Sequence, residues 1–187
     1  MKTRSYQGIV MIGVILLAGF MLQACKCKCP PPPPPPAAKA ASPMVLPISE
    51  MASIEIKAPV EKVFSYMEDT NNMLAYFPGT KSVTNVQGKG LGMTFQWEGD
   101  FGGKPTQSQD LVTDYVPNQR VVITDSLGDT WTAIYVPGAE GGTKLTMLLQ
   151  GFPQVPEITD AIQKDVSKQY QQLLQAILNN IKAAVEK

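Results

Sequence analysis

A stripe of apolar residues near the C-terminus constrains the fold more than any other feature of this 187-residue sequence. Its members recur every three or four positions, the spacing of one face of an α-helix. They are Ile158, Ile162, Val166, Tyr170, Leu173, Ile177, Ile181 and Ala184. The spacing predicts a helix of about 28 residues, roughly 42 Å long. A helix with a single apolar stripe must lie along another apolar surface, which the rest of the chain has to supply.

Segments with the two-residue period of β-strands can form that surface. We expect a first strand at 51–57, in which Ile54 and Ile56 alternate with polar residues, and then two short helices at 60–69 and 70–76. Six further strands follow, at 81–87, 93–98, 106–115, 120–126, 130–136 and 143–150. The segments between them are short and rich in Gly, Pro, Asn or Asp, which favours antiparallel hairpins.

The N-terminus has the composition of a targeting segment. Lys2 and Arg4 precede 14 residues, 9–22, that are all apolar or glycine. This run is shorter than the roughly 20 residues that a membrane-spanning helix needs, and it is typical of a secretory signal peptide. We therefore assign residues 1–24 to a signal peptide. An ordinary signal peptide cleaved nearby and an uncleaved anchor helix remain open as alternatives to the lipoprotein signal described next.

Residues Leu22, Ala24 and Cys25 resemble the lipobox of bacterial lipoproteins. The resemblance implies that Cys25 is acylated and becomes the first residue of the mature protein, which two acyl chains would hold on a membrane of the cell envelope. Lys26 follows the cysteine, where an Asp signals inner-membrane retention in enteric bacteria. The outer membrane is therefore the expected location, on either its periplasmic or its surface side.

Residues 25–50 form the expected tether between this anchor and a folded domain. Seven consecutive prolines, Pro30 to Pro36, can adopt only a polyproline II helix, roughly 20 Å long. We interpret it as a stiff spacer, and the alternative is a ligand for an aromatic groove. Cys27 and Cys29 lack the spacing of a zinc site and are interpreted as acylation sites, disulfide partners or incidental residues rather than as a metal clip.

Composition narrows the chemistry of the remaining domain, 51–187. The chain has no histidine, which excludes a Ser-His-Asp triad, a Cys-His pair and an imidazole metal site. The domain holds 11 basic and 15 acidic residues, a net charge of −4, so nucleic acid is not an expected partner. No acid-base pair is recognisable, and we predict no catalytic residues, no metal and no cofactor.

Several strings in this order resemble the START and birch-pollen-allergen superfamily, also called the SRPBCC or polyketide cyclase/dehydrase-like group. They are APVEKVF at 58–64, YFPG at 76–79, DYVPNQRV at 114–121 and GGTKLT at 141–146. The resemblance implies an α+β helix-grip fold, in which a curved seven-stranded antiparallel sheet wraps around the long C-terminal helix. It also implies a cavity between the sheet and this helix for a hydrophobic ligand.

Alternating apolar residues on the strands are the predicted cavity walls, although each could instead be solid core. Methionine, which fills irregular shapes, occurs five times in the domain, at 51, 67, 73, 93 and 147. The predicted ligand-binding residues are Met93, Phe95, Trp97, Trp131, Tyr135, Leu145, Met147 and Leu149 on strands, with Ile162, Val166, Tyr170, Leu173 and Ile177 on the long helix.

Polar residues that could orient a ligand are harder to assign. Candidates for an inward orientation are Glu98, Gln107, Gln109, Thr113 and Tyr170. The polar stretch 106–110 is either an exposed strand or a polar patch inside the cavity, and exposure is the favoured interpretation. Asp125 and Asp129 flank a turn and are interpreted as turn-forming residues.

Together these features predict an envelope lipoprotein that binds a hydrophobic small molecule or lipid, as a carrier or sensor. Two alternatives stay open. One is an interaction module that binds another envelope protein, and the less favoured one is a cyclase- or aromatase-like enzyme.

Overall fold

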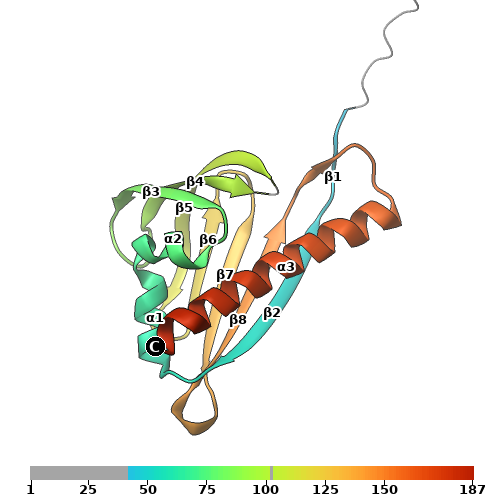
Figure 1. Cartoon of the computed structure of the whole chain (residues 1–187). Helices are drawn as coiled ribbons and strands as arrows, with labels where there is room; N and C mark the ends of the chain where they lie inside the picture. The colour runs from blue at the N-terminus through green and yellow to red at the C-terminus, as the bar shows by residue number, and fades with distance from the viewer. Residues whose placement is uncertain (1–41, 102) are drawn as a thin grey trace, which may run out of the picture. The chain divides into compact units, whose positions relative to one another are not determined.

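The fold is built on a curved seven-stranded antiparallel sheet (Figure 1). The structure, a computed structural model, describes residues 42–101 and 103–187. The strands lie in the order β2-β8-β7-β6-β5-β4-β3. Their bounds are β2 Ile48–Ile56, β3 Thr80–Gln87, β4 Thr94–Phe101, β5 Lys104–Val116, β6 Arg120–Asp125, β7 Thr130–Pro137 and β8 Thr143–Gly151. Consecutive strands from β3 to β8 pair through hairpins, and β2 joins the meander beside β8, so the predicted helix-grip fold is confirmed.

Helices lie on one face of the sheet. The predicted pair after the first strand is present as α1, Val60–Glu68, followed by the one-turn 3₁₀ helix η1, Thr70–Asn72, and α2, Met73–Tyr76. The long helix α3, Asp160–Val185, crosses the sheet over β2 and β8 and ends beside α1 (Figure 1). A second one-turn helix, η2 (Ala139–Gly141), lies between β7 and β8.

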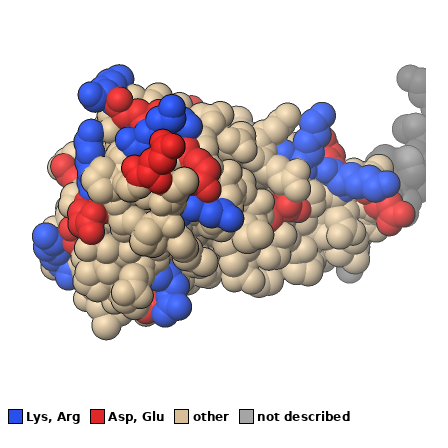
Figure 2. All heavy atoms as spheres, turned by 90° about the horizontal axis from the view of Figure 1, so that it is seen from below, with Lys and Arg blue, Asp and Glu red and all other residues tan. Residues whose placement is uncertain are grey.

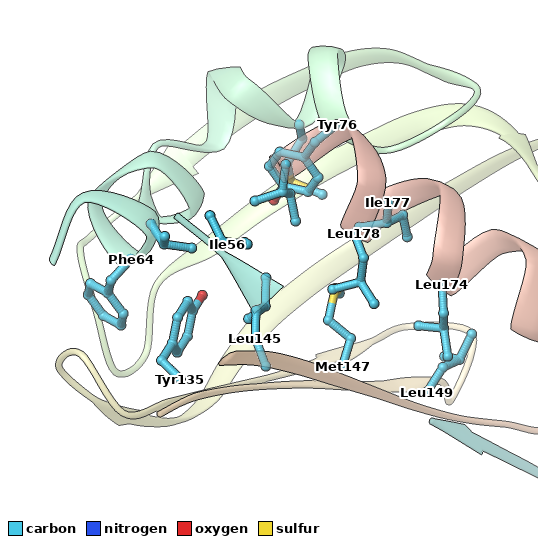
Figure 3. Close-up of a cluster of buried hydrophobic side chains, with 14 of the residues drawn as sticks. Ile56, Phe64, Tyr76, Tyr135, Leu145, Met147, Leu149, Leu174, Ile177 and Leu178 are labelled. Carbon is cyan, nitrogen blue, oxygen red and sulfur yellow. The ribbon is translucent and has the colours of Figure 1, made fainter. Parts of the chain in front are cut away.

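The apolar stripe on α3 is buried mainly in its second half. Thr159 caps the helix by accepting a hydrogen bond from the amide of Ile162 at 3.2 Å. The fully buried residues include Leu174 and Leu178, which the sequence spacing does not place on the stripe. Figure 3 shows Leu174, Ile177 and Leu178 directed toward the strand that carries Leu145, Met147 and Leu149. This part of the sheet and α3 form a solid core.

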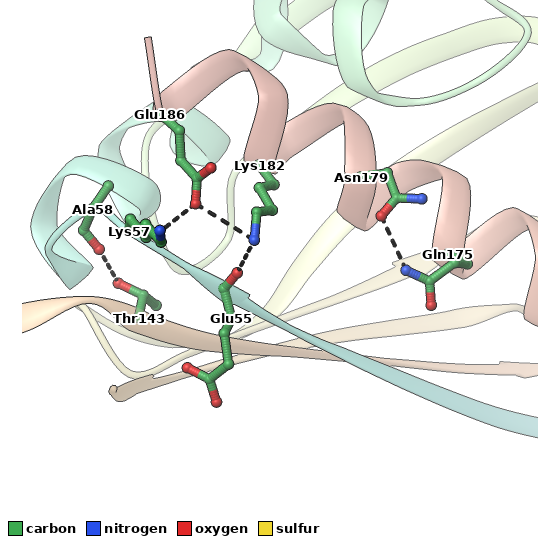
Figure 4. Close-up of polar contacts among 8 residues, drawn as sticks. All are labelled: Glu55, Lys57, Ala58, Thr143, Gln175, Asn179, Lys182 and Glu186. Atoms are coloured by element: carbon green, nitrogen blue, oxygen red, sulfur yellow. Dashed lines mark hydrogen bonds and ion pairs between the residues drawn. The ribbon is translucent and has the colours of Figure 1, made fainter. Parts of the chain in front are cut away.

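Polar contacts fasten the C-terminal end of α3 to the start of the domain (Figure 4). The Glu186 carboxylate accepts a hydrogen bond from the Lys57 amide at 2.6 Å. Lys182 donates to the Glu55 carbonyl at 2.7 Å, and Lys62 donates to the Val185 carbonyl at 2.6 Å. The last turn of the helix therefore cannot shift along the sheet without breaking several hydrogen bonds.

The sequence predicts that the domain starts at residue 51, but the folded region begins earlier. Leu46 and Ile48 are buried, and β2 starts at Ile48. A second, two-stranded sheet pairs β1 (Met44–Val45) with β9 (Gln154–Val155). Prolines on both sides of Leu46 break the alternation that identifies a strand. This apolar segment therefore resembles the proline-rich tether in the sequence. The predicted signal peptide, Cys25 and the proline run lie outside the described residues.

Charged side chains of both signs are interspersed on the face shown in Figure 2. The described ion pairs include Lys81 with Asp100 at 3.2 Å and Arg120 with Asp114 at 2.6 Å. Both pairs are solvent-accessible, so each contributes about 0–1 kcal/mol. Within the described ranges, no helix is long and apolar enough to cross a membrane.

Candidate ligand-binding cavity

A cavity of about 110 Å³ lies between the sheet and the short helices. Its walls come from α1, η1 and α2 on one side and from β4 to β8 on the other. An engineered apolar cavity of about 150 Å³ binds benzene, so this smaller space holds at most about one aromatic ring without rearrangement. A larger ligand must displace side chains of the wall.

Aromatic rings make up much of the wall. Phe77 packs edge-on against Trp97 and Trp131, with ring centroids 5.5 and 5.2 Å apart. Phe64 packs against Tyr135 in the same way, at 5.2 Å. The Trp97 indole nitrogen donates to the Thr80 hydroxyl at 2.9 Å, so its polar atom is satisfied outside the cavity lining. Mutual packing holds these rings in place and leaves apolar surface facing the cavity.

Four methionines complete the apolar wall. They are Met67, Met73, Met93 and Met147, whereas Met51 is exposed. Tyr135 donates its hydroxyl proton to the Met67 sulfur at 3.2 Å. Methionine has three rotatable side-chain bonds, so these residues can move aside for a ligand with little strain. Four of the five methionines of the domain therefore line the cavity.

One polar part of the cavity wall lies along the inner face of β5. Thr106, Ser108 and Asp110 alternate toward the cavity, and Ser108 and Asp110 are buried. The favoured interpretation of 106–110 as an exposed strand is therefore wrong for these residues. Their neighbours Gln107 and Gln109 are exposed, as are Glu98 and Thr113, so those proposed ligand contacts face solvent.

Two further carboxylates line this part of the cavity. Asp125 accepts hydrogen bonds from the amides of Leu127 and Asp129, at 2.9 and 3.0 Å, and thus forms the turn as predicted. Asp129 accepts from the Phe152 amide at 3.2 Å. Both residues also face the cavity, which the turn interpretation does not anticipate.

Burial changes the acidity of these groups. The pKa of Asp110 is raised to about 6, chiefly because burial disfavours its charged form; the hydrogen bond from Ser108 opposes this shift, and the charge of Asp125 adds to it. The pKa of Asp129 is also raised, by burial first and by Asp125 second. Among the described residues, no group of three or more His, Cys, Asp or Glu side chains is arranged to hold a metal ion.

At the other side of the cavity, Glu68 links α1 to two neighbouring segments. Its carboxylate accepts a hydrogen bond from the Tyr115 hydroxyl at 2.5 Å and pairs with Lys89 at 3.6 Å. Gly90, in the loop before β4, lies against the Tyr115 ring, where an added Cβ would approach a ring carbon to 3.1 Å. Glu68, Gly90 and Tyr115 all line the cavity.

The structure brings together six of the predicted binding residues: Met93, Phe95, Trp97, Trp131, Tyr135 and Met147. The other seven are not among the described residues of the lining. Leu145, Leu149 and Ile177 are in the solid core, where Tyr170 is also buried, and Ile162, Val166 and Leu173 pack at its margin. The cavity is therefore enclosed by the short helices, not by α3, because α3 packs directly on β2 and β8.

The sequence prediction did not include the cavity residues on the short helices, although an apolar pattern marks them. Phe64, Met67, Met73, Tyr76 and Phe77 form the apolar side of the segment 60–77, and all five line the cavity. Their spacing indicates helices, but it does not distinguish a helix that closes a cavity from one that fills a core.

The curved sheet, the short helices and the long helix α3 define a helix-grip domain, with an apolar cavity between the sheet and the short helices. Residues 49–186 match the family described as polyketide cyclase / dehydrase and lipid transport, and the chain belongs to this family. No curated protein matches the sequence.

Solved structures share the fold at low sequence identity. A protein from Thermus thermophilus is 19% identical with a TM-score of 0.61, and the match covers 74% of this chain and 97% of that one. A START superfamily protein from Mycobacterium smegmatis is 14% identical, with a TM-score of 0.62 and coverage of 74% and 97%. The Zhui aromatase/cyclase from Streptomyces sp. R1128 is 14% identical, with a TM-score of 0.58 and coverage of 75% and 94%. Because the match fills nearly all of those chains, this domain corresponds to a complete folding unit.

Proposed function

We propose that this protein binds a hydrophobic small molecule or lipid in the cavity, as a carrier or sensor of the bacterial cell envelope. The observation that carries the proposal is the contrast within one small core: α3 and β8 pack solidly, while aromatic and methionine side chains enclose an open volume beside them. An apolar space of this kind costs stability, since its lining loses dispersion contacts. A ligand would restore them.

Catalysis is the alternative that the aromatase/cyclase neighbour suggests. Asp110 is its strongest candidate, because it is buried in the cavity and has a pKa of about 6, within the useful range of a general acid or base. The described lining offers Asp110 only carboxylates and hydroxyls as polar neighbours, without a cationic group to act as its counterpart. We therefore favour binding over catalysis.

The binding proposal is tested on the compact unit 40–187, which holds every buried residue described above. Native mass spectrometry of this unit, purified without detergent, is expected to show co-purified apolar ligand or uptake of a fluorescent apolar probe. Ala133 on β7 is buried at the cavity wall, so Ala133→Leu fills the space and should weaken probe binding at least tenfold. Lys168→Ala, on the exposed face of α3, is the matched control. Equal binding by all three proteins would contradict the cavity as the site.

The envelope location rests on the N-terminal sequence and has a separate test. Metabolic labelling with an alkyne fatty acid should mark the full chain, and Cys25→Ala should lose both the label and the membrane fraction. Cys27→Ala is the control and should keep both. Membrane association of Cys25→Ala equal to that of the wild type would contradict lipid anchoring through this residue.

A further inference from the structure

The polar part of the cavity contains an organised row of side chains. On the paired strands β4, β5 and β6, Phe95 lies opposite Asp110 and Asp110 lies opposite Asp125. Directly opposite residues point to the same face of a sheet, so the two carboxylates share the inner face. Asp129, in the turn before β7, adds a third carboxylate to the same lining. Like charges placed opposite each other destabilise a sheet unless something compensates them.

Asp110 has unused hydrogen-bonding capacity inside the cavity. It is 7% exposed, and its Oδ1 accepts the Ser108 hydroxyl proton at 2.6 Å. Its second oxygen receives no hydrogen bond from the described residues, although an ionised carboxylate has about four acceptor sites. Every fully buried side-chain oxygen in the described ranges has a hydrogen-bond partner. Because the second oxygen of Asp110 has none, part of its surface must be accessible. Since Asp110 lines the cavity, a ligand can reach it there.

No described cation compensates these three carboxylates. The four ion pairs of the described ranges use other acids, namely Asp100, Glu68, Asp114 and Glu186. On the face shown in Figure 2, by contrast, acidic and basic side chains are interspersed. Asp125 and Asp129 accept hydrogen bonds from backbone amides, which use part of their acceptor capacity. Asp110 accepts only from the Ser108 hydroxyl. An uncompensated negative charge is therefore concentrated where the cavity is polar.

Helix α3 contributes a hydroxyl beside this cluster. A Cβ built on Gly151 would lie 2.9 Å from Asp129 Oδ1 and 3.2 Å from the Tyr170 hydroxyl oxygen. Both polar atoms thus lie over the same glycine, and the absence of a side chain there gives them room. The polar groups of this region come from four elements or turns: Ser108 and Asp110 on β5, Asp125 on β6, Asp129 at the β6–β7 turn and, beside Asp129, Tyr170 on α3.

We propose that the ligand is an amphiphile with a cationic amine, which binds Asp110 beside Asp125 and Asp129 while its apolar body lies among the aromatic and methionine side chains. This inference rests on the proposed function. An ammonium group supplies both the missing hydrogen-bond donors and the missing positive charge, and charge-assisted hydrogen bonds are about twice as strong as neutral ones. A carboxylate head would be repelled by the three acids, and a hydroxyl head would supply a donor without charge.

The test compares three probes that share one apolar body: 2-(1-naphthyl)ethylamine, 2-(1-naphthyl)ethanol and 1-naphthylacetate. Each competes with the neutral fluorescent probe N-phenyl-1-naphthylamine for unit 40–187 at pH 7.5. The amine is expected to displace the probe at a concentration at least tenfold lower than the carboxylate, with the alcohol between them. In Asp110→Asn this preference should fall to about twofold, whereas Asp114→Asn, at a half-exposed acid on the same strand, should keep it.

A pH series on the unmodified protein makes the test independent of any variant. The amine preference should weaken as the pH falls through about 6, the pKa at which Asp110 takes up a proton. Three outcomes would overturn the amine inference but leave the cavity as the binding site: a preference for the carboxylate, no displacement of the probe by the amine, or an amine preference that persists in Asp110→Asn and at low pH. Failure of the neutral probe to bind at all would instead contradict the proposed function itself.

Discussion

The two sides of the core differ in residue type although they share the same sheet. On the packed side, leucine and isoleucine from β8 and α3 interlock, and Leu145, Leu149 and Leu178 are fully buried. On the cavity side, aromatic rings, methionines and a few polar groups face one another across a space. Branched aliphatic residues fill volume in defined rotamers, whereas rings and thioethers leave irregular gaps. The solid core and the open volume therefore lie at different parts of one sheet.

The largest difference is expected from matched truncations on the two sides. Leu178→Ala on the packed side should reduce the free energy of unfolding by about 2–5 kcal/mol, because it opens a new hole in a closed core. Met67→Ala on the cavity side should cost about 1 kcal/mol, because part of its surface already faces open space. Urea denaturation measures both. Leu74→Ala, at a residue that is 51% exposed, is the control and should have little effect. Equal losses of unfolding free energy in Leu178→Ala and Met67→Ala would contradict the difference in packing between the two sides.

Gly151 lies where the packed side meets the cavity, at the end of β8. Gly151→Ala should destabilise the fold by about 1–3 kcal/mol, because the new Cβ would meet Asp129 at 2.9 Å and the Tyr170 ring at 3.0 Å. The sign of this change in stability is informative, since replacing glycine with alanine within a strand ordinarily stabilises the fold by roughly 0.5–1 kcal/mol. Thermal unfolding gives the measurement, and a stabilised variant would show that this junction is loosely packed.

The ionisation of Asp110 should make the cavity side pH-sensitive. The pKa of this carboxyl is about 6 in the folded protein and 3.8 ordinarily, so the folded state binds more protons between these values. Its contribution to the free energy of unfolding is therefore full below about pH 4 and falls as the pH rises to about 6. Asp110→Asn should be more stable than the wild type at pH 7 by about 1–2 kcal/mol, with little difference at pH 4.

Urea midpoints at pH 4, 5, 6 and 7 measure this difference. Asp114→Asn is the control on the same strand, because Asp114 is half-exposed and paired with Arg120. A constant difference between Asp110→Asn and the wild type over the series would contradict the raised pKa.

The smallest change in stability is expected from filling the cavity. Ala133→Leu should alter the free energy of unfolding by less than about 1 kcal/mol, because the larger side chain enters existing space. The same substitution weakens probe binding in the test above. A loss of several kcal/mol would mean that the cavity is closed at this position.

Most of the fold follows from periodicity, since alternation and turn residues locate all seven strands of the large sheet. The face of β5 is harder to predict. Thr106, Ser108 and Asp110 share the inner face with Val112, but polar residues carry no hydrophobic signal for their orientation. A register shift between Val112 and Asp114 then turns Tyr115 inward, and nothing in the sequence marks it.

The cavity itself could be predicted only in part. Its strand residues are found because they alternate, yet the same pattern selects Leu145 and Leu149, which pack against α3. Whether an apolar face is filled or hollow depends on the position of the helix above it, which is a property of tertiary packing rather than of local sequence.

The pairing of β2 with β8 has a consequence for how the chain folds. Ser53 and Thr146 share a hydrogen bond of 2.8 Å although 93 positions separate them, and α3 comes later still. Contacts between distant positions slow folding, because a long loop must close before they form. The edge of the sheet that carries the packed core therefore cannot assemble until nearly the whole chain has been synthesised. Until then β2 has no partner strand.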